Sequence, residues 1–145
     1  MRSGFVKWHN EASFDERRRG TELGSEWAGV EGTRESVEWL WEKHFAAVGG
    51  DANVFEAWPA TDERYRPYPL FEYILDHETH IWLTGSTGLH DVLLALWGTP
   101  IGEMFNLEEL AETCRKHQKW SCFFTSAPLN FPGGVASPPN AICVL

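Results

Sequence analysis

The segment LHDVLLALWGTPIGE, residues 89–103, places the strongest constraint on how this chain can fold. Its apolar residues recur at spacings of three and four, which predicts a helix with one buried face. Gly98 is suited to the left-handed conformation that ends a helix, and Pro100 prevents the helix from resuming. A strand is expected to start directly after this proline. The apolar positions of the expected helix are Leu89, Val92, Leu93, Leu96 and Trp97.

The same segment carries two side chains of the types that bind metals or transfer protons, His90 and Glu103. His90 lies at the start of the expected helix, and Glu103 lies where the chain enters the expected strand. This spacing permits the imidazole and the carboxylate to converge on one point. We therefore select His90 and Glu103 as candidate site residues.

The length and net charge of the chain limit the number of domains and the kinds of partner that it can have. The 145 residues suffice for one domain with a substantial core. A net charge of −9 argues against nucleic acid or an anionic membrane as the partner. We find no membrane-spanning run and no signal peptide. An odd number of cysteines without metal-ligand spacing indicates a reduced, cytoplasmic protein; they are Cys114, Cys122 and Cys143.

The remaining elements alternate between strand and helix, which predicts an α/β fold with about three helices. Residues 10–32 are expected to form a polar loop in which three arginines face solvent. For three residues outside the candidate site we expect structural positions. His44 should pack against the helix or lie on the surface, Asp51 should be an exposed turn acid, and Cys114 should belong to the core. The other expected elements are a strand over residues 4–9, a helix from its N-cap Thr33 to Val48, a helix capped by Asn106 with Glu109, and strands within residues 120–127 and 141–145.

Residues 60–88 contain a second group of metal-ligand type, His77, Glu78 and His80. Two histidines on one helical face are better served by a spacing of four, as in H-E-x-x-H, and here the spacing is three. On a strand, residues three apart point to opposite faces. This group is therefore ranked behind His90 and Glu103.

Three segments together resemble the C-terminal half of the cyclase family, especially its fungal branch: VEWLWEKHFAAVGGD, LHDVLLALWGTPIGEMFNLEELAETC and FFTSAPLNFPGGVASPPNAICVL. That family contains bacterial kynurenine formamidases and isatin hydrolases. The opening RSGFVKWHN is similar to a strand in the middle of those proteins. The likeness covers residues 2–59 and 89–145, and the final block is the specific part, with S-x-P-L-N, G-G and S-P-P-N in fixed order.

The resemblance implies a partial swivelling β/β/α fold, usually in dimers. It also implies a zinc- or manganese-dependent hydrolase that acts on the C–N bond of a small amide, such as an aromatic N-formyl amide. In such enzymes a metal-bound water attacks the carbonyl group. The late histidine and glutamate of the family match His90 and Glu103, where they complete the metal site or assist proton transfer.

Two departures from the family pattern matter. The main metal motif of the family, H-x-G-T-H-x-D, has no counterpart here, since HETHIW has histidines three apart and Trp82 in place of the aspartate. Residues 60–88 also match nothing in the family, where this connection is shorter, as for an insertion or translated non-coding sequence. The chain is therefore expected to be a single, incomplete cyclase-like domain over residues 1–145.

Two further functions remain open. In the first, the chain is a non-catalytic fragment or pseudoenzyme that packs against an intact relative or against a second copy of itself. In the second, it is a protein whose eight tryptophans bind an aromatic small molecule without chemistry. Loss of half a fold exposes apolar surface, which favours association. Metal content separates a working hydrolase from the fragment, and ligand-dependent tryptophan fluorescence without turnover would indicate the binding protein.

Overall fold

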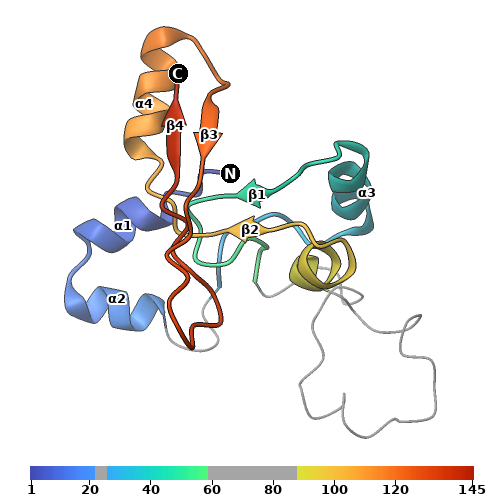
Figure 1. Ribbon diagram of the computed structural model, residues 1–145. Coiled ribbons are helices and arrows are strands. Elements are labelled where there is room, and N and C mark those ends of the chain that lie inside the picture. The colour runs from blue at the N-terminus through green and yellow to red at the C-terminus, as the bar shows by residue number, and fades with distance from the viewer. Residues whose placement is uncertain (22–25, 59–87) are drawn as a thin grey trace, which may run out of the picture. The chain divides into compact units, whose positions relative to one another are not determined.

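The computed structural model describes residues 1–21, 26–58 and 88–145 (Figure 1). The chain divides into two compact units, Met1–Phe105 and Asn106–Leu145. Helices and short strands occur in both, so the chain belongs to the mixed α/β class, as predicted. Within the described residues, none of the helices has the length and apolar character needed to cross a bilayer.

The first unit begins with helix α1 (Phe5–Glu11), where a strand was predicted over residues 4–9. That prediction is wrong because a short apolar run fits a helix or a strand equally well. The aromatic side chains here have helical spacing. The ring of Phe5 lies 5.6 Å from that of Trp8 and 5.9 Å from that of His9, so they pack along one face of the helix.

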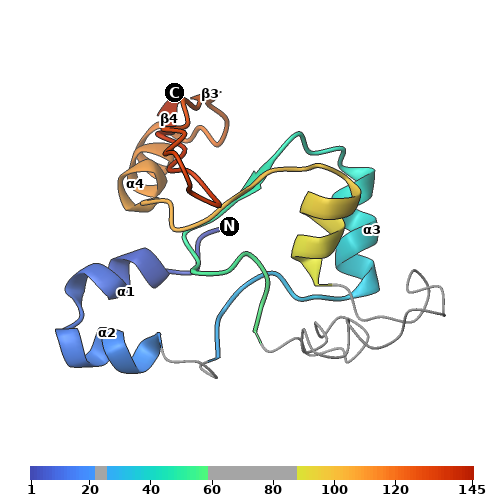
Figure 2. The same ribbon diagram turned by 60° about the horizontal axis from the view of Figure 1, so that its bottom comes forward.

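Helix α2 (Phe14–Gly20) replaces part of the loop expected over residues 10–32, and it lies beside α1 (Figure 2). Ser13 and Glu16 form a capping box: the Glu16 carboxylate accepts the N–H of Ser13 at 2.8 Å, and the Ser13 hydroxyl accepts the N–H of Glu16 at 3.4 Å. The S-x-x-E signal for this helix is present in the sequence. The three arginines therefore occupy its last turn, where positive charge suits the helix dipole.

Helix α3 (Arg34–Glu42) begins at the predicted cap, because the hydroxyl of Thr33 accepts the N–H of Ser36 at 3.2 Å. The helix ends at Glu42 and not at Val48, because His44 takes a left-handed conformation with φ of 53°. Val48 lies instead in strand β1 (Val48–Gly49). This strand pairs in parallel with β2 (Ile101–Gly102).

The core of the first unit lies between α3 and the helix that starts at Leu89, which are neighbours in Figures 1 and 2. From Asp91 this helix continues as the π-helix η3 (Asp91–Leu96), in which the N–H of Trp97 donates to the carbonyl of Val92 at 3.0 Å. The wider turn moves Leu96 away from the buried face and leaves it 53% exposed, contrary to the predicted stripe. The buried members of this core cluster are Leu40, Phe55, Leu89 and Leu93.

The predicted end of this helix is confirmed. Gly98 has φ of 68°, the left-handed conformation that closes a helix, and β2 begins directly after Pro100. The rings of Trp97 and Trp41 lie 5.0 Å apart, so the last helical turn is packed against α3. The local signals in residues 89–103 therefore define the element that carries both candidate residues.

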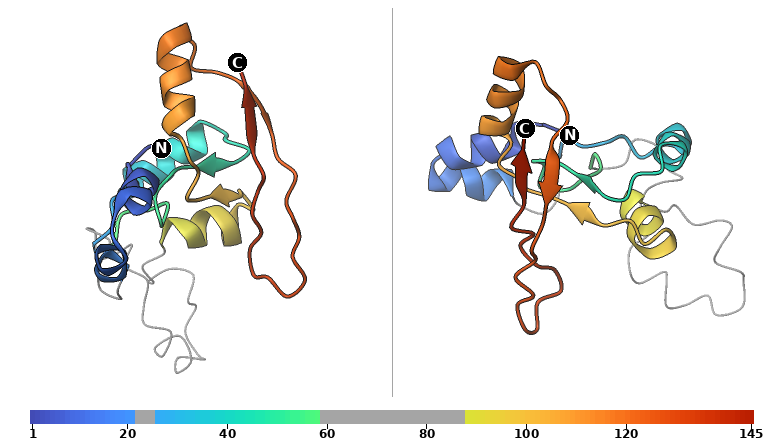
Figure 3. Two further views of the ribbon diagram at one scale, coloured as in Figure 1. Left: turned by 90° about the vertical axis from the view of Figure 1, so that its left-hand side faces the viewer. Right: turned by 45° about the horizontal axis from the view of Figure 1, so that its top comes forward.

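The second unit contains helix α4 (Glu108–His117) and the strands β3 (Phe123–Thr125) and β4 (Ile142–Val144), as predicted. The two strands pair antiparallel. Figure 3 shows the connection between the two strands extending well beyond them. The predicted cap is wrong: Leu107 is the N-cap, and the side chain of Asn106 accepts the N–H of Glu108 at 3.4 Å. Leu107 adopts φ of −98° and ψ of 3°, which delays the helix by one residue.

The three cysteines come together in this second unit, and all carry free thiols. Cys114 is buried on α4, as predicted. A hydrogen bond to Cys122, together with burial, raises the pKa of the Cys143 thiol to about 11. Cys143 is therefore a protonated thiol at neutral pH, which does not favour a nucleophilic function.

Two adjacent leucines of η3 test the position of the core. We expect Leu93→Ala to lower the free energy of unfolding by about 2–5 kcal/mol, because Leu93 is only 1% exposed and its loss leaves a cavity. Leu94→Ala should change it by no more than about 0.5 kcal/mol, because Leu94 is 46% exposed. Urea unfolding followed by tryptophan fluorescence measures both values. Equal losses would contradict this assignment of the core.

Candidate functional site

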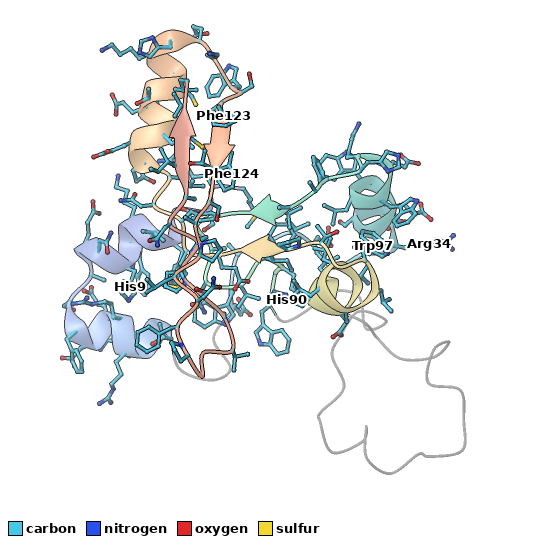
Figure 4. The ribbon with its side chains drawn as sticks, in the orientation of Figure 1. His9, Arg34, His90, Trp97, Phe123 and Phe124 are labelled. Atoms are coloured by element: carbon cyan, nitrogen blue, oxygen red, sulfur yellow. The ribbon has the colours of Figure 1, made fainter. Side chains whose placement is uncertain are left out.

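The imidazole of His90 lies between two carboxylates. Its Nδ1 atom is 2.6 Å from Oε2 of Glu56, and its Nε2 atom is 3.2 Å from Oε1 of Glu103. The backbone N–H of His90 also donates to Oε2 of Glu56 at 3.1 Å. Figure 4 labels His90 at the start of the helix that leads to Trp97. The two residues selected from the sequence therefore lie together, and Glu56 joins them.

Glu56 is fixed by the backbone on both sides of it. The N–H of Val30 donates to the carbonyl of Phe55 at 2.9 Å, and the N–H of Ala57 donates to the carbonyl of Val30 at 2.8 Å. The side chain of Glu56 is only 12% exposed. Its carboxylate is therefore held at the first turn of the helix, where backbone N–H groups and the helix dipole favour negative charge.

Glu103 is positioned by the strand pair and by the segment that carries Glu56. The N–H of Phe55 donates to Oε1 of Glu103 at 2.7 Å. On either side of Glu103, the carbonyl of Gly102 accepts the N–H of Gly50, and the N–H of Met104 donates to Ala52, both at 3.0 Å. Phe55 and Glu56 are neighbours in one loop, so this loop supplies one of the carboxylates that flank the histidine and binds the other.

These carboxylates determine the protonation of His90. The hydrogen bond to Glu56 is the largest influence and raises the pKa of the imidazole above its usual value, while partial burial opposes it. The negative charges of Glu56, Glu103 and Asp91 raise the pKa further. The imidazolium form is thereby favoured, and it suits the geometry because both ring nitrogens then carry a hydrogen to donate.

The described residues do not fit a catalytic zinc or manganese ion by themselves. A catalytic zinc takes three protein ligands, and both nitrogens of His90 are already engaged by carboxylates. Across residues 1–21, 26–58 and 88–145, no group of three or more histidine, cysteine, aspartate or glutamate side chains could hold a metal ion. His77 and His80 lie outside the described residues.

Asp51 is not the exposed turn acid that the sequence predicted; it is buried. Its carboxylate accepts the N–H of Ser3, the hydroxyl of Ser3 at 3.0 Å and the N–H of Gly4 at 2.7 Å. Burial raises the pKa of Asp51, but these hydrogen bonds outweigh burial and hold the pKa below its usual value. Asp51 therefore fixes the residues before α1 to the loop after β1, which is a structural function.

His44, for which the sequence predicted a packing or surface position, is exposed.

The sequence interpretation missed Glu56. It lies 34 residues before its partner His90 and belongs to no spacing pattern or motif. Its position depends on backbone pairing with Val30, again a contact between distant parts of the chain. Local sequence rules contain no signal for such a contact.

Comparison of the chain with models of protein families, with curated proteins and with solved structures found no match. The resemblance to the cyclase family therefore stays a prediction. Inference about function depends on the arrangement of Glu56, His90 and Glu103.

Three substitutions test which carboxylate controls the histidine. Glu56→Gln should lower the pKa of His90 most, Glu103→Gln less and Asp91→Asn least, following the order of their influence. Titration of the His90 ring protons by NMR measures each value. Because the pKa is raised on folding, the stabilisation from His90 is complete below the unfolded-state pKa of about 6.5 and is lost as pH rises through the folded-state value. An unchanged pKa in Glu56→Gln would contradict this assignment.

Proposed function

We propose that this chain is a cyclase-family hydrolase, similar to the kynurenine formamidases, that cleaves the C–N bond of a small aromatic N-formyl amide. The observation that supports this function best is that His90 and Glu103, the two positions that the resemblance implies, lie together with Glu56, since each ring nitrogen of His90 faces one of the two carboxylates. The group is partly open to solvent, with the side chains of His90 and Glu103 34% and 31% exposed. A small substrate can therefore approach the Nε2 side of the ring.

We assign His90 to proton transfer and not to metal ligation. Glu56 accepts the hydrogen on Nδ1 and orients the ring, as the third member of a catalytic triad orients its histidine. Cleavage of an amide needs a proton for the departing nitrogen. The raised pKa keeps a proton on His90 to a higher pH than on an ordinary imidazole, and Nε2 is the nitrogen that faces the more exposed carboxylate.

Glu103 is the second member of the proposed proton-transfer pair. Its Oε1 atom is held by the N–H of Phe55 and lies next to Nε2 of His90. From this position the carboxylate stabilises the imidazolium and can accept a proton from the attacking water. The resemblance also supports a dimer and a zinc or manganese ion, whose ligands would have to include residues beyond those described. The cysteine content supports a cytoplasmic location.

A second candidate function is non-catalytic association with a partner subunit or a second copy. The hairpin of the second unit favours it, because its strands expose large apolar side chains on both faces: Phe123 is 71% exposed, Phe124 51% and Ile142 62%. An isolated two-stranded hairpin is marginally stable in water, and exposed apolar side chains of this size favour contact with another surface.

Turnover of an aromatic formamide such as formanilide tests the first candidate. We expect His90→Ala to reduce kcat/KM by about 10²-fold or more, because positioned proton transfer contributes about that much. Glu103→Ala should also lower it. The control is His44→Ala, which removes an exposed histidine outside the site. The assay is run with and without added zinc or manganese.

Two outcomes would reject this proposal. Equal turnover in wild type and His90→Ala would remove the histidine from the mechanism. Absence of turnover in wild type with either metal, together with a molar mass above that of one chain in light scattering, would favour the association function instead.

A further inference from the structure

The first unit contains a hollow of about 320 Å³ that involves none of the three site residues. It is lined by residues from α1, from the end of α2 and from the segment before α3. Its lining includes Ala28 and three aromatic rings, those of Phe5, Trp8 and Trp27. The polar side chains that line it are Ser3, Glu26 and Asn53.

The three rings contact one another at tilted angles. The ring of Phe5 lies 5.6 Å from that of Trp8 at 47°, and 5.9 Å from that of Trp27 at 57°. Tilted rings at these distances attract one another without stacking face to face. The indole of Trp8 lies close against Gly20, where a Cβ would overlap the ring. The aromatic wall is therefore built from contacts between α1, α2 and the segment at Trp27.

The charge of the lining is negative. Glu26 contributes a carboxylate, and among the described residues no lysine, arginine or histidine lines the hollow. An anionic ligand would be repelled, and a neutral one would gain little from the carboxylate. A cation gains from both the carboxylate and the electron-rich ring faces.

We propose that this hollow binds a small organic cation of the alkylammonium type. Its methyl or methylene groups lie against the rings of Phe5, Trp8 and Trp27, and its charge is paired with Glu26. Aromatic rings around a cation are the usual means of recognising quaternary ammonium groups. The volume is at the lower end of the range for small-molecule sites, which suits a ligand of the size of choline. This site does not depend on the proposed hydrolase function.

Choline and its neutral isostere 3,3-dimethylbutan-1-ol provide a matched pair of probes. Both are titrated into the full chain while the indole N–H signals of the tryptophans are followed by NMR. We expect choline to shift the signals of Trp8 and Trp27, and to bind about tenfold more tightly than the alcohol, as a cation–π contribution of this kind implies. The signal of Trp39, which does not line the hollow, should not move.

Single substitutions test separately how the carboxylate and the aromatic rings contribute to choline binding. Glu26→Gln should weaken choline binding roughly threefold to tenfold and leave the alcohol unaffected, while Glu42→Gln, at the end of α3, should change neither. Trp8→Leu should weaken choline binding, with Trp39→Leu as its control. Circular dichroism checks that each variant is folded, and Glu26→Gln keeps the test valid if Trp8→Leu does not fold.

Three results would overturn the proposal. Equal affinity for choline and the alcohol would mean an apolar hollow without cation recognition. Unmoved signals of Trp8 and Trp27 would mean that choline does not bind there. Unchanged affinity in Glu26→Gln would remove the carboxylate from the site.

Discussion

The hydrogen bonds between Glu56 and His90 join parts of the first unit that lie far apart in the sequence. Glu56 belongs to the segment that pairs with Val30, and His90 opens the helix that fills the core. Through its other nitrogen, His90 reaches Glu103 at the end of β2. A single imidazole thus links a loop, a helix start and a strand end, and the geometry of the candidate site depends on it.

This arrangement also resolves an electrostatic conflict. Without the histidine, the carboxylates of Glu56 and Glu103 would lack the cation that lies between them, and a like charge nearby favours protonation of one of them. The imidazolium compensates both charges, and the N–H groups of His90 and Phe55 satisfy further oxygen lone pairs. The same contacts that stabilise the charges also hold the ring in place and raise its pKa, as the proposed proton transfer requires. Structure and proposed chemistry therefore depend on the same hydrogen bonds.

Local sequence rules predicted those parts of the fold that local interactions determine. Thr33 caps α3 through its own hydroxyl, and Gly98 closes the helix before β2, as their residue types indicate. The same rules failed over residues 4–9, where a short aromatic run fits helix and strand alike, and at Leu96, where a π-turn alters the period. Glu56 and Asp51 could not be assigned, because their partners lie tens of residues away. Two of the three members of the candidate site, those within one helix–strand unit, were thus selected from the sequence, and the member from a distant loop was missed.

The most direct test of the link between Glu56 and His90 is a double-mutant cycle on the free energy of unfolding, with Glu56→Gln, His90→Ala and the double variant compared by urea unfolding at pH 6. If the two side chains form one group, the coupling energy should be roughly 0.5–3 kcal/mol. A parallel cycle with Glu42→Gln, at the exposed end of α3, should give additive effects within about 0.5 kcal/mol. Additive effects for Glu56 and His90 as well would contradict the central claim that this contact organises the site.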